Sequence, residues 1–181
     1  MTSMTLDQTA SPSDAGPSHH ETHHAAKTYV TFDLAGECMG VEVANVREIL
    51  DRQPIIRLPN TSSDVEGVID IRGESIPVVD MGSRLGLPRS PDSEETRIIV
   101  FEIGVDSDTR PIGVFADRVR DVMLISENMI EKPTSIADMV HSPKLLRGIA
   151  RHNELLILLL DVQSVFHESD ELSNDLDPAF L

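Results

Sequence analysis

Apolar and polar residues alternate along much of the chain in short runs, which is typical of half-buried β-strands. Residues 29–34 and 98–103 are such runs, rich in β-branched and aromatic side chains with polar residues interposed. Turn-forming residues separate the runs, and the sequence has no long helical periodicity. The pattern therefore predicts an all-β fold, either small barrels or a sandwich, rather than βαβ units.

The stretch 67–80, which reads GVIDIRGESIPVVD, predicts a β-hairpin. Its β-branched residues suit a pleated surface. The turn is expected at residues 72–74, where Gly73 can take a positive φ without steric cost. Asp70, Arg72 and Glu74 then point into solvent, either as a recognition surface or as an ordinary solvated turn.

The chain repeats part of its own sequence. Residues 40–50, GVEVANVREIL, match residues 113–123, GVFADRVRDVM, without a gap and 73 positions apart. A second correspondence lies 81 positions apart, so the second copy carries extra residues near 135–147. The residues so related are Gly67 with Gly148 and Asp80 with Asp161. Each copy holds about five short strands, and because barrels of this size are marginal alone, we expect a shared apolar interface.

Short helices are predicted after two aspartates, at Met81–Leu85 and Val162–Phe166. Asp80 and Asp161 are the expected N-caps of these helices. A third short helix is expected around Ile136–Val140, within the extra residues of the second copy.

Composition excludes several classes of function. The chain has 181 residues, of which 40% are hydrophobic, a net charge of -16 and no tryptophan. It lacks the positive charge and the aromatic platforms of a nucleic-acid binder, and an anionic membrane would repel it. Cys38 is the only cysteine, which excludes an intramolecular disulfide and favours a reducing compartment. With no secretory signal and no apolar run longer than Leu155–Leu160, we expect a cytoplasmic protein that is not inserted in a membrane.

The two ends of the chain differ from its centre. Residues 1–26 are rich in Ser, Thr, Pro, Asp and His and are expected to be disordered. Four histidines there would share one helical face that could hold a transition metal, but a solvated tail is the favoured interpretation. They are His19, His20, His23 and His24. Residues 168–181 are expected to form a mobile acidic tail, although Leu172 and Leu176 are spaced for a short helix.

The sequence offers no candidate active site. Cys38 has no neighbouring base, and the carboxylates are scattered as on a solvated surface. The sequence contains neither a phosphate-binding glycine-rich loop nor a zinc-binding motif. We therefore predict no catalytic residue, no metal and no cofactor.

Glu48 and Arg72 stand near two strand ends of the first copy, where the second copy has Asp121 and Asn153. Because the second copy lacks this pair of charges, the pair does not serve to pack the two copies symmetrically. An exposed ion pair contributes only about 0.2–1 kcal/mol to stability. If the two residues do pair, the expected purpose is to orient Arg72 for a partner.

Several motifs follow one another in a specific order and spacing. They are Phe32-Asp33-Leu34, Gly40–Val43 with Val46–Leu50, Ile56–Pro59, Gly67–Gly73 with Ile76–Asp80, Gly113–Val119, Gly148–Ala150 and Leu156–Asp161. Together they resemble the CheW family, the coupling proteins of bacterial chemosensory arrays. The resemblance covers residues 27–166, close to the whole predicted folded part.

The resemblance implies two five-stranded SH3-like β-barrels packed on a shared apolar seam, within a CheW-like domain at residues 27–167. The first barrel is expected near 27–85 and the second near 95–167, with an exchange of edge strands left open. The family resemblance also implies a non-enzymatic scaffold that joins chemoreceptor cytoplasmic tips to the regulatory domain of a CheA-type histidine kinase. Receptor tips are expected in a groove between the barrels and the kinase at the end of one barrel. Self-association in rings is left open.

By position, the resemblance implies a set of partner-binding residues: Val46, Glu48, Gly67, Asp70, Ile71, Arg72 and Gly73. From the residues alone, Val46 is expected in the core and Gly67 is expected to relieve crowding at a strand start. Where the family usually has Asn-Leu-Arg-Gly, this chain has Asp70 in place of the asparagine. Asp70 is an acceptor-only charge that can compete with Glu48 for Arg72. The alternative function is therefore a diverged CheW-like adaptor of a specialised, non-flagellar array with altered receptor specificity.

Overall fold

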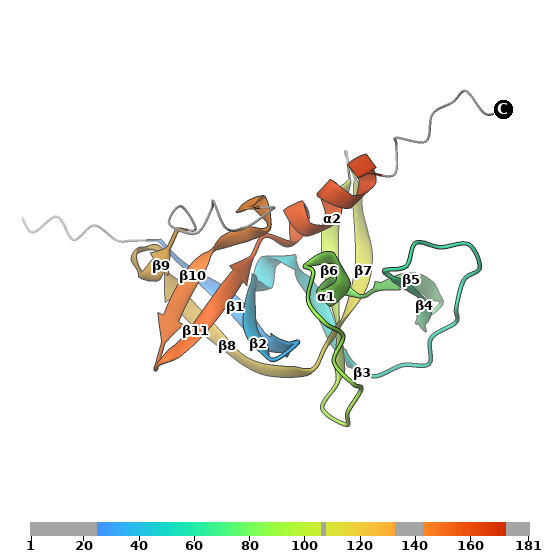
Figure 1. The fold of residues 1–181 in the computed structure, drawn as a ribbon, viewed down its shortest axis with the longest axis horizontal. Coiled ribbons are helices and arrows are strands. Elements are labelled where there is room, and N and C mark those ends of the chain that lie inside the picture. Colours follow the sequence, from blue (N-terminus) through green and yellow to red (C-terminus); the bar gives the residue numbers. More distant parts are fainter. Residues whose placement is uncertain (1–24, 106–107, 133–142, 173–181) are drawn as a thin grey trace, which may run out of the picture.

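The computed structural model describes residues 25–105, 108–132 and 143–172 (Figure 1). The strands are β1 (Ala26–Leu34), β2 (Glu37–Glu42), β3 (Val46–Asp51), β4 (Val65–Ile71), β5 (Glu74–Val79), β6 (Arg97–Val105), β7 (Asp108–Ala116), β8 (Arg118–Ser126), β9 (Ile130–Glu131), β10 (Leu146–His152) and β11 (Leu155–Leu160). The α-helices are α1 (Met81–Arg84) and α2 (Val162–Leu172), and the 3-10 helices are η1 (Val43–Asn45), η2 (Glu127–Met129) and η4 (Pro143–Leu145). Strands thus dominate the described residues, which confirms the predicted all-β fold with a few short helices.

The strands form two sheets, which we call the six-stranded and the five-stranded barrel. The order in the six-stranded barrel is β8-β1-β2-β11-β10-β9, and in the five-stranded barrel β3-β6-β7-β5-β4. The extra strand of the six-stranded barrel, β9, has only two residues. Apart from β9, the two barrels therefore correspond strand by strand, as the duplicated sequence predicts.

Each barrel takes strands from both copies of the repeat. β1 pairs with β8 and β2 pairs with β11, so these two strands of the first copy lie in the six-stranded barrel. In return β6 pairs with β3 and β7 pairs with β5 in the five-stranded barrel. The exchanged strands lie inside the sheets rather than at their edges. Each barrel therefore needs the other copy of the repeat to be complete.

The largest apolar core lies between the barrels, which confirms the predicted shared seam. It includes Phe32 and Met39 from the six-stranded barrel, Ile99 and Phe101 from the five-stranded barrel, and Phe166 from α2. Each barrel also has a smaller core of its own. Because apolar area is buried both within and between the barrels, the two should unfold together.

Both predicted helix N-caps are found. The Asp80 carboxylate accepts a hydrogen bond from the backbone N–H of Ser83 at 3.1 Å, and Asp161 accepts one from Ser164 at 3.2 Å. α1 ends at Arg84, one residue earlier than predicted, and α2 continues to Leu172, six residues further than predicted. The helix predicted at 136–140 and the four histidines of the N-terminal tail lie outside the described residues.

Gly67 relieves crowding at a strand start, as predicted. Its φ is +143°, and a Cβ there would collide with the backbone carbonyl oxygen of Ile56, which crosses β4 beside it. At the corresponding Gly148, a Cβ would lie 2.5 Å from Cγ2 of Ile130 and 2.7 Å from the carbonyl oxygen of Glu131. Both glycines therefore let a neighbouring segment close one end of a barrel.

Candidate docking site at the β4–β5 hairpin

The β4–β5 hairpin ends in a two-residue turn. Ile71 pairs with Glu74, so only Arg72 and Gly73 lie between the strands, and the predicted turn at 72–74 was one residue too long. Both turn residues have positive φ, +55° for Arg72 and +86° for Gly73. This combination matches the twist of the flanking strands, but it is sterically unfavourable for a residue with a Cβ. Arg72 thus holds a conformation that residues such as asparagine adopt more easily, which is typical of a functional position.

Asp70 stabilises this turn. Its carboxylate accepts a hydrogen bond from the backbone N–H of Gly73 at 2.9 Å. The side-chain oxygen of an asparagine could accept the same bond. The difference from the usual family residue therefore preserves the turn and adds one exposed negative charge.

Arg72 approaches Glu48, a pairing that the sequence left open. Its Nη2 lies 3.6 Å from Oε2 of Glu48, and no ion pair between Arg72 and Asp70 is found in the described parts of the chain. The Arg72 side chain is 83% exposed, whereas that of Glu48 is 19% exposed. Glu48 is therefore held by its surroundings, and Arg72 extends from it into solvent.

A second ion pair ties the hairpin to β3. Arg47 donates to both carboxylate oxygens of Glu74, at 3.2 and 2.7 Å. β3 and β5 are not neighbours in the sheet, so this contact bridges strands that the backbone does not join. The bidentate hydrogen bond lowers the pKa of Glu74 and raises the pKa of Arg47 from their ordinary values.

The remaining predicted site residues lie behind the hairpin surface. Val46 is partly buried and packs against the seam core. Ile71 is buried in the core of the five-stranded barrel, and Gly67 is buried beneath Ile56. These three residues hold the hairpin in place, while Asp70, Arg72 and Gly73 are exposed. We call residues 70–74 the hairpin tip.

Sequence reasoning missed the pairing of Arg47 with Glu74. Glu74 was expected to point freely into solvent, and Arg47 was not singled out. The alternating burial of β3 places Arg47 on the outer side, which the alternation in the sequence already suggests. Its partner, however, depends on how the barrel curls, and local sequence does not specify that.

The corresponding hairpin of the six-stranded barrel, β10–β11, lacks these features. Its turn residues are Asn153 and Glu154, with φ of +45° and +65°. Arg120, the counterpart of Arg47 in the repeat, contacts Asp33 on β1 instead, at 2.5 Å. Of these two hairpins, only β4–β5 thus has an arginine at its tip and an ion pair to β3.

Other candidate chemistry finds little support in the structure. Cys38 is buried, and desolvation raises the pKa of its thiol, which disfavours the nucleophilic thiolate. In the described ranges, three or more His, Cys, Asp or Glu side chains nowhere gather as a metal site would require. None of the helices in those ranges combines the length and the apolar composition needed to cross a bilayer.

Two small barrels on a common core, with a charged hairpin exposed on one of them, place the chain in the class of paired SH3-like β-barrels. Comparison with known proteins gives the family, because the family model of the CheW-like domain matches residues 28–170. The chain therefore belongs to the CheW family.

Individual relatives agree with this assignment. The chemotaxis protein CheW of Thermotoga maritima is 28% identical over 139 residues, covering 77% of this chain and 87% of that protein. The chemotaxis protein CheW of Rhizobium meliloti is 28% identical over 144 residues, covering 79% and 89%. Among solved structures, the scaffolding protein TtCheW from Thermoanaerobacter tengcongensis aligns with a TM-score of 0.68 and 32% identity, covering 82% of this chain and 92% of that one.

Proposed function

We propose that this chain is a non-enzymatic coupling scaffold of a bacterial chemosensory array. It would join the cytoplasmic tips of chemoreceptors to the regulatory domain of a CheA-type histidine kinase, and so act in the cytoplasm beside the receptor membrane. Its relatives are named as chemotaxis proteins, and the solved relative is named as a scaffolding protein. The observation that carries the proposal is the hairpin tip, where Arg72 is exposed and its backbone and neighbours are held in place.

The hairpin tip is suited to docking because it is organised before any partner binds. The Asp70 bond fixes the turn, and the Arg47–Glu74 ion pair fixes the hairpin relative to β3. A partner then loses little conformational entropy in ordering this surface. The Arg72 guanidinium has five N–H donors, and its single contact with Glu48 leaves most of them for a carboxylate or carbonyl of the partner.

Exposed apolar side chains beside the seam support a second contact, with the helical receptor tip. Val122 and Leu124 on β8 are 57% and 68% exposed. Val122 lies opposite Val30 of β1, which belongs to the seam core. Val122 therefore places an exposed apolar side chain beside the seam, which supports docking of the apolar face of a helix there.

The proposal is tested by reversing the charge at the hairpin tip. Arg72→Glu should leave the fold intact but reduce co-sedimentation with receptor-bearing membranes and with the kinase by about tenfold or more, because a desolvated charged contact contributes about 1.5–3 kcal/mol. Arg72→Asn removes the charge while suiting the positive φ of the turn, so it should also lose binding without loss of stability.

The matched control is Arg151→Glu, an equal change of charge at an exposed arginine next to the other hairpin. It should bind both partners as the native chain does. Undiminished binding by Arg72→Glu, with receptor and kinase assayed separately, would show that the hairpin tip is not the docking surface.

Asp70 favours a second candidate function, the diverged adaptor of a specialised array. The exposed carboxylate alters the charge of the tip while the turn bond is kept. Asp70→Asn should change the free energy of unfolding by no more than about 0.5 kcal/mol. Stronger binding of this variant to receptor tips of ordinary flagellar arrays would favour the diverged adaptor, and unchanged binding would favour the general scaffold.

A further inference from the structure

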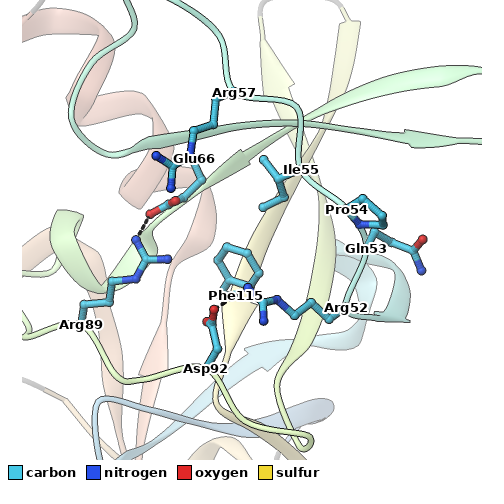
Figure 2. Close-up of a pocket in the computed structure, with 9 residues that line it drawn as sticks. All are labelled: Arg52, Gln53, Pro54, Ile55, Arg57, Glu66, Arg89, Asp92 and Phe115. Atoms are coloured by element: carbon cyan, nitrogen blue, oxygen red, sulfur yellow. Dashed lines mark hydrogen bonds and ion pairs between the residues drawn. The ribbon is translucent and has the colours of Figure 1, made fainter.

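We propose that a cleft at the far end of the five-stranded barrel binds a small phosphorylated ligand of the mononucleotide class. The cleft has a volume of about 480 Å³ and is lined in part by Arg52, Arg57, Arg89, Glu66, Asp92 and Phe115 (Figure 2). It begins directly after β3, whose first residues contact the hairpin tip. The cleft and the docking site therefore lie toward opposite ends of one strand, about 20 Å apart by the rise of β-strands.

The cleft gathers positive charge on an acidic protein. The chain has a net charge of -16, yet three arginines from two separate connections line this one cleft. Arg52 forms an ion pair with Asp92, and Arg89 forms one with Glu66. For Arg57, no ion pair or side-chain hydrogen bond is found in the described residues, so the cleft keeps at least one guanidinium to offer.

The arrangement favours a phosphate over a carboxylate. A ligand carboxylate would only replace Glu66 or Asp92 as the partner of one arginine, so its net binding free energy would be small. A phosphate monoester carries about 1.5–2 negative charges at neutral pH and three acceptor oxygens, so it can bridge two guanidinium groups. In Figure 2, Arg57 and Arg89 come from different segments and both point toward Glu66. A phosphate that enters the cleft beside Glu66 could bridge the two arginines, because a guanidinium binds such oxygens in a bidentate manner.

The shape and the apolar wall favour a compact ligand with a ring. The volume lies in the range of about 300–1,000 Å³ that is usual for small-molecule sites. Phe115, Ile55 and Pro54 supply an apolar side next to the arginines, and Figure 2 shows the Phe115 ring in the middle of the cleft. A long polyanion would extend beyond the cleft and be repelled by the net charge of -16 that the chain carries. A single nucleotide has a phosphate for the arginines, a ring for the apolar wall and a size that suits the volume of the cleft.

The test is a titration of the full chain, labelled with ¹⁵N, with inorganic phosphate, adenosine monophosphate and adenosine. We expect amide shifts confined to residues 52–57, 66, 89–92 and 115. Adenosine monophosphate should bind more tightly than inorganic phosphate, with a Kd of about 1 mM or below, and adenosine alone more weakly. Absence of shifts at about 10 mM of either phosphate-bearing ligand would overturn the proposal, and equal affinity for the two would overturn the mononucleotide class.

Variants locate the site. Arg57→Gln should weaken binding of both phosphate-bearing ligands by about tenfold, the effect of losing one charge-assisted contact, and it is an exposed change that should not affect folding. Arg151→Gln, an exposed arginine on the other barrel, is the matched control and should bind normally. Phe115→Leu should weaken the nucleotide but not inorganic phosphate. Unchanged binding in Arg57→Gln would show that the cleft is not the site.

Discussion

The two corresponding hairpins of the molecule, β4–β5 and β10–β11, share one backbone plan and differ in what their tips carry. Both have two-residue turns with positive φ, and both begin beside a buried glycine that a neighbouring segment crosses. Only the first places an arginine in the turn and has an ion pair that joins the hairpin to β3. In the second, the turn residues are Asn153 and Glu154, and Arg120, the counterpart of Arg47, contacts Asp33 on β1.

The difference separates the requirements of folding from those of function. Features present in both hairpins follow from closing a barrel, because any sequence with this topology needs a small residue where a segment crosses the strand and a tight turn between the strands. Both turns hold a non-glycine residue at positive φ, but only the first places an arginine there. The equivalent hairpin does without this arginine, which is why we propose that it serves a partner rather than the fold.

The largest effect on stability is expected at the buried glycine that both hairpins share. Gly67→Ala should lower the free energy of unfolding by about 3 kcal/mol, because the new Cβ meets a backbone oxygen at an unfavourable φ, and Gly148→Ala by about 2 kcal/mol. Urea denaturation measures both. If only one of the two variants were destabilised, the structural equivalence of the hairpins would be broken.

A smaller effect, on partner binding, is expected at the arginine whose contacts differ between the two hairpins. Arg47→Met should reduce partner binding by about three- to tenfold, because the hairpin tip is no longer held against β3, while stability changes little for an exposed pair. Arg120→Met, at the corresponding position, should leave binding unchanged. Pull-down with the kinase and thermal unfolding of both variants test this. Equal loss of binding in both would mean that Arg47 acts through general charge.

The smallest effect concerns pH. The pKa of Glu74 is lowered from its ordinary 4.5 by the hydrogen bond with Arg47, so the folded state favours the charged form. Its contribution to stability is therefore complete above pH 4.5 and is lost as pH falls through the lowered pKa. The ¹³C shift of the Glu74 carboxyl should titrate below 4.5 in the native chain and move up toward 4.5 in Arg47→Met. Identical midpoints in the two proteins would show that the ion pair does not form in solution.

Local features of the fold could be predicted well. The runs around Phe32 and Phe101 are strands, Asp80 and Asp161 cap helices, and Gly73 lies in a turn at positive φ, because each depends on a few neighbouring residues. The repeat also indicated two similar units. Helix ends were less accurate, since α1 ends one residue before its predicted end and α2 ends six residues after it.

The candidate site was predictable only in part. The sequence left open whether Glu48 and Arg72 pair, and the structure shows their contact. The Arg47–Glu74 ion pair could not be predicted, since it joins strands that are distant in sequence and not adjacent in the sheet. For the same reason, the arginines of the cleft gave no signal, because Arg52, Arg57 and Arg89 come together only when the connections between strands fold over the barrel end.

The sequence by itself determined that the chain forms strands, that it contains a duplication and that it resembles one family. Alternation, helix capping and motif spacing each depend on residues that are close together in the sequence. Only the tertiary structure decided which strands pair. The exchange of β1–β2 with β6–β7 places the largest core between the barrels, and it depends on the total apolar area buried rather than on any local preference. The residues that meet at the hairpin tip and in the cleft follow from that exchange.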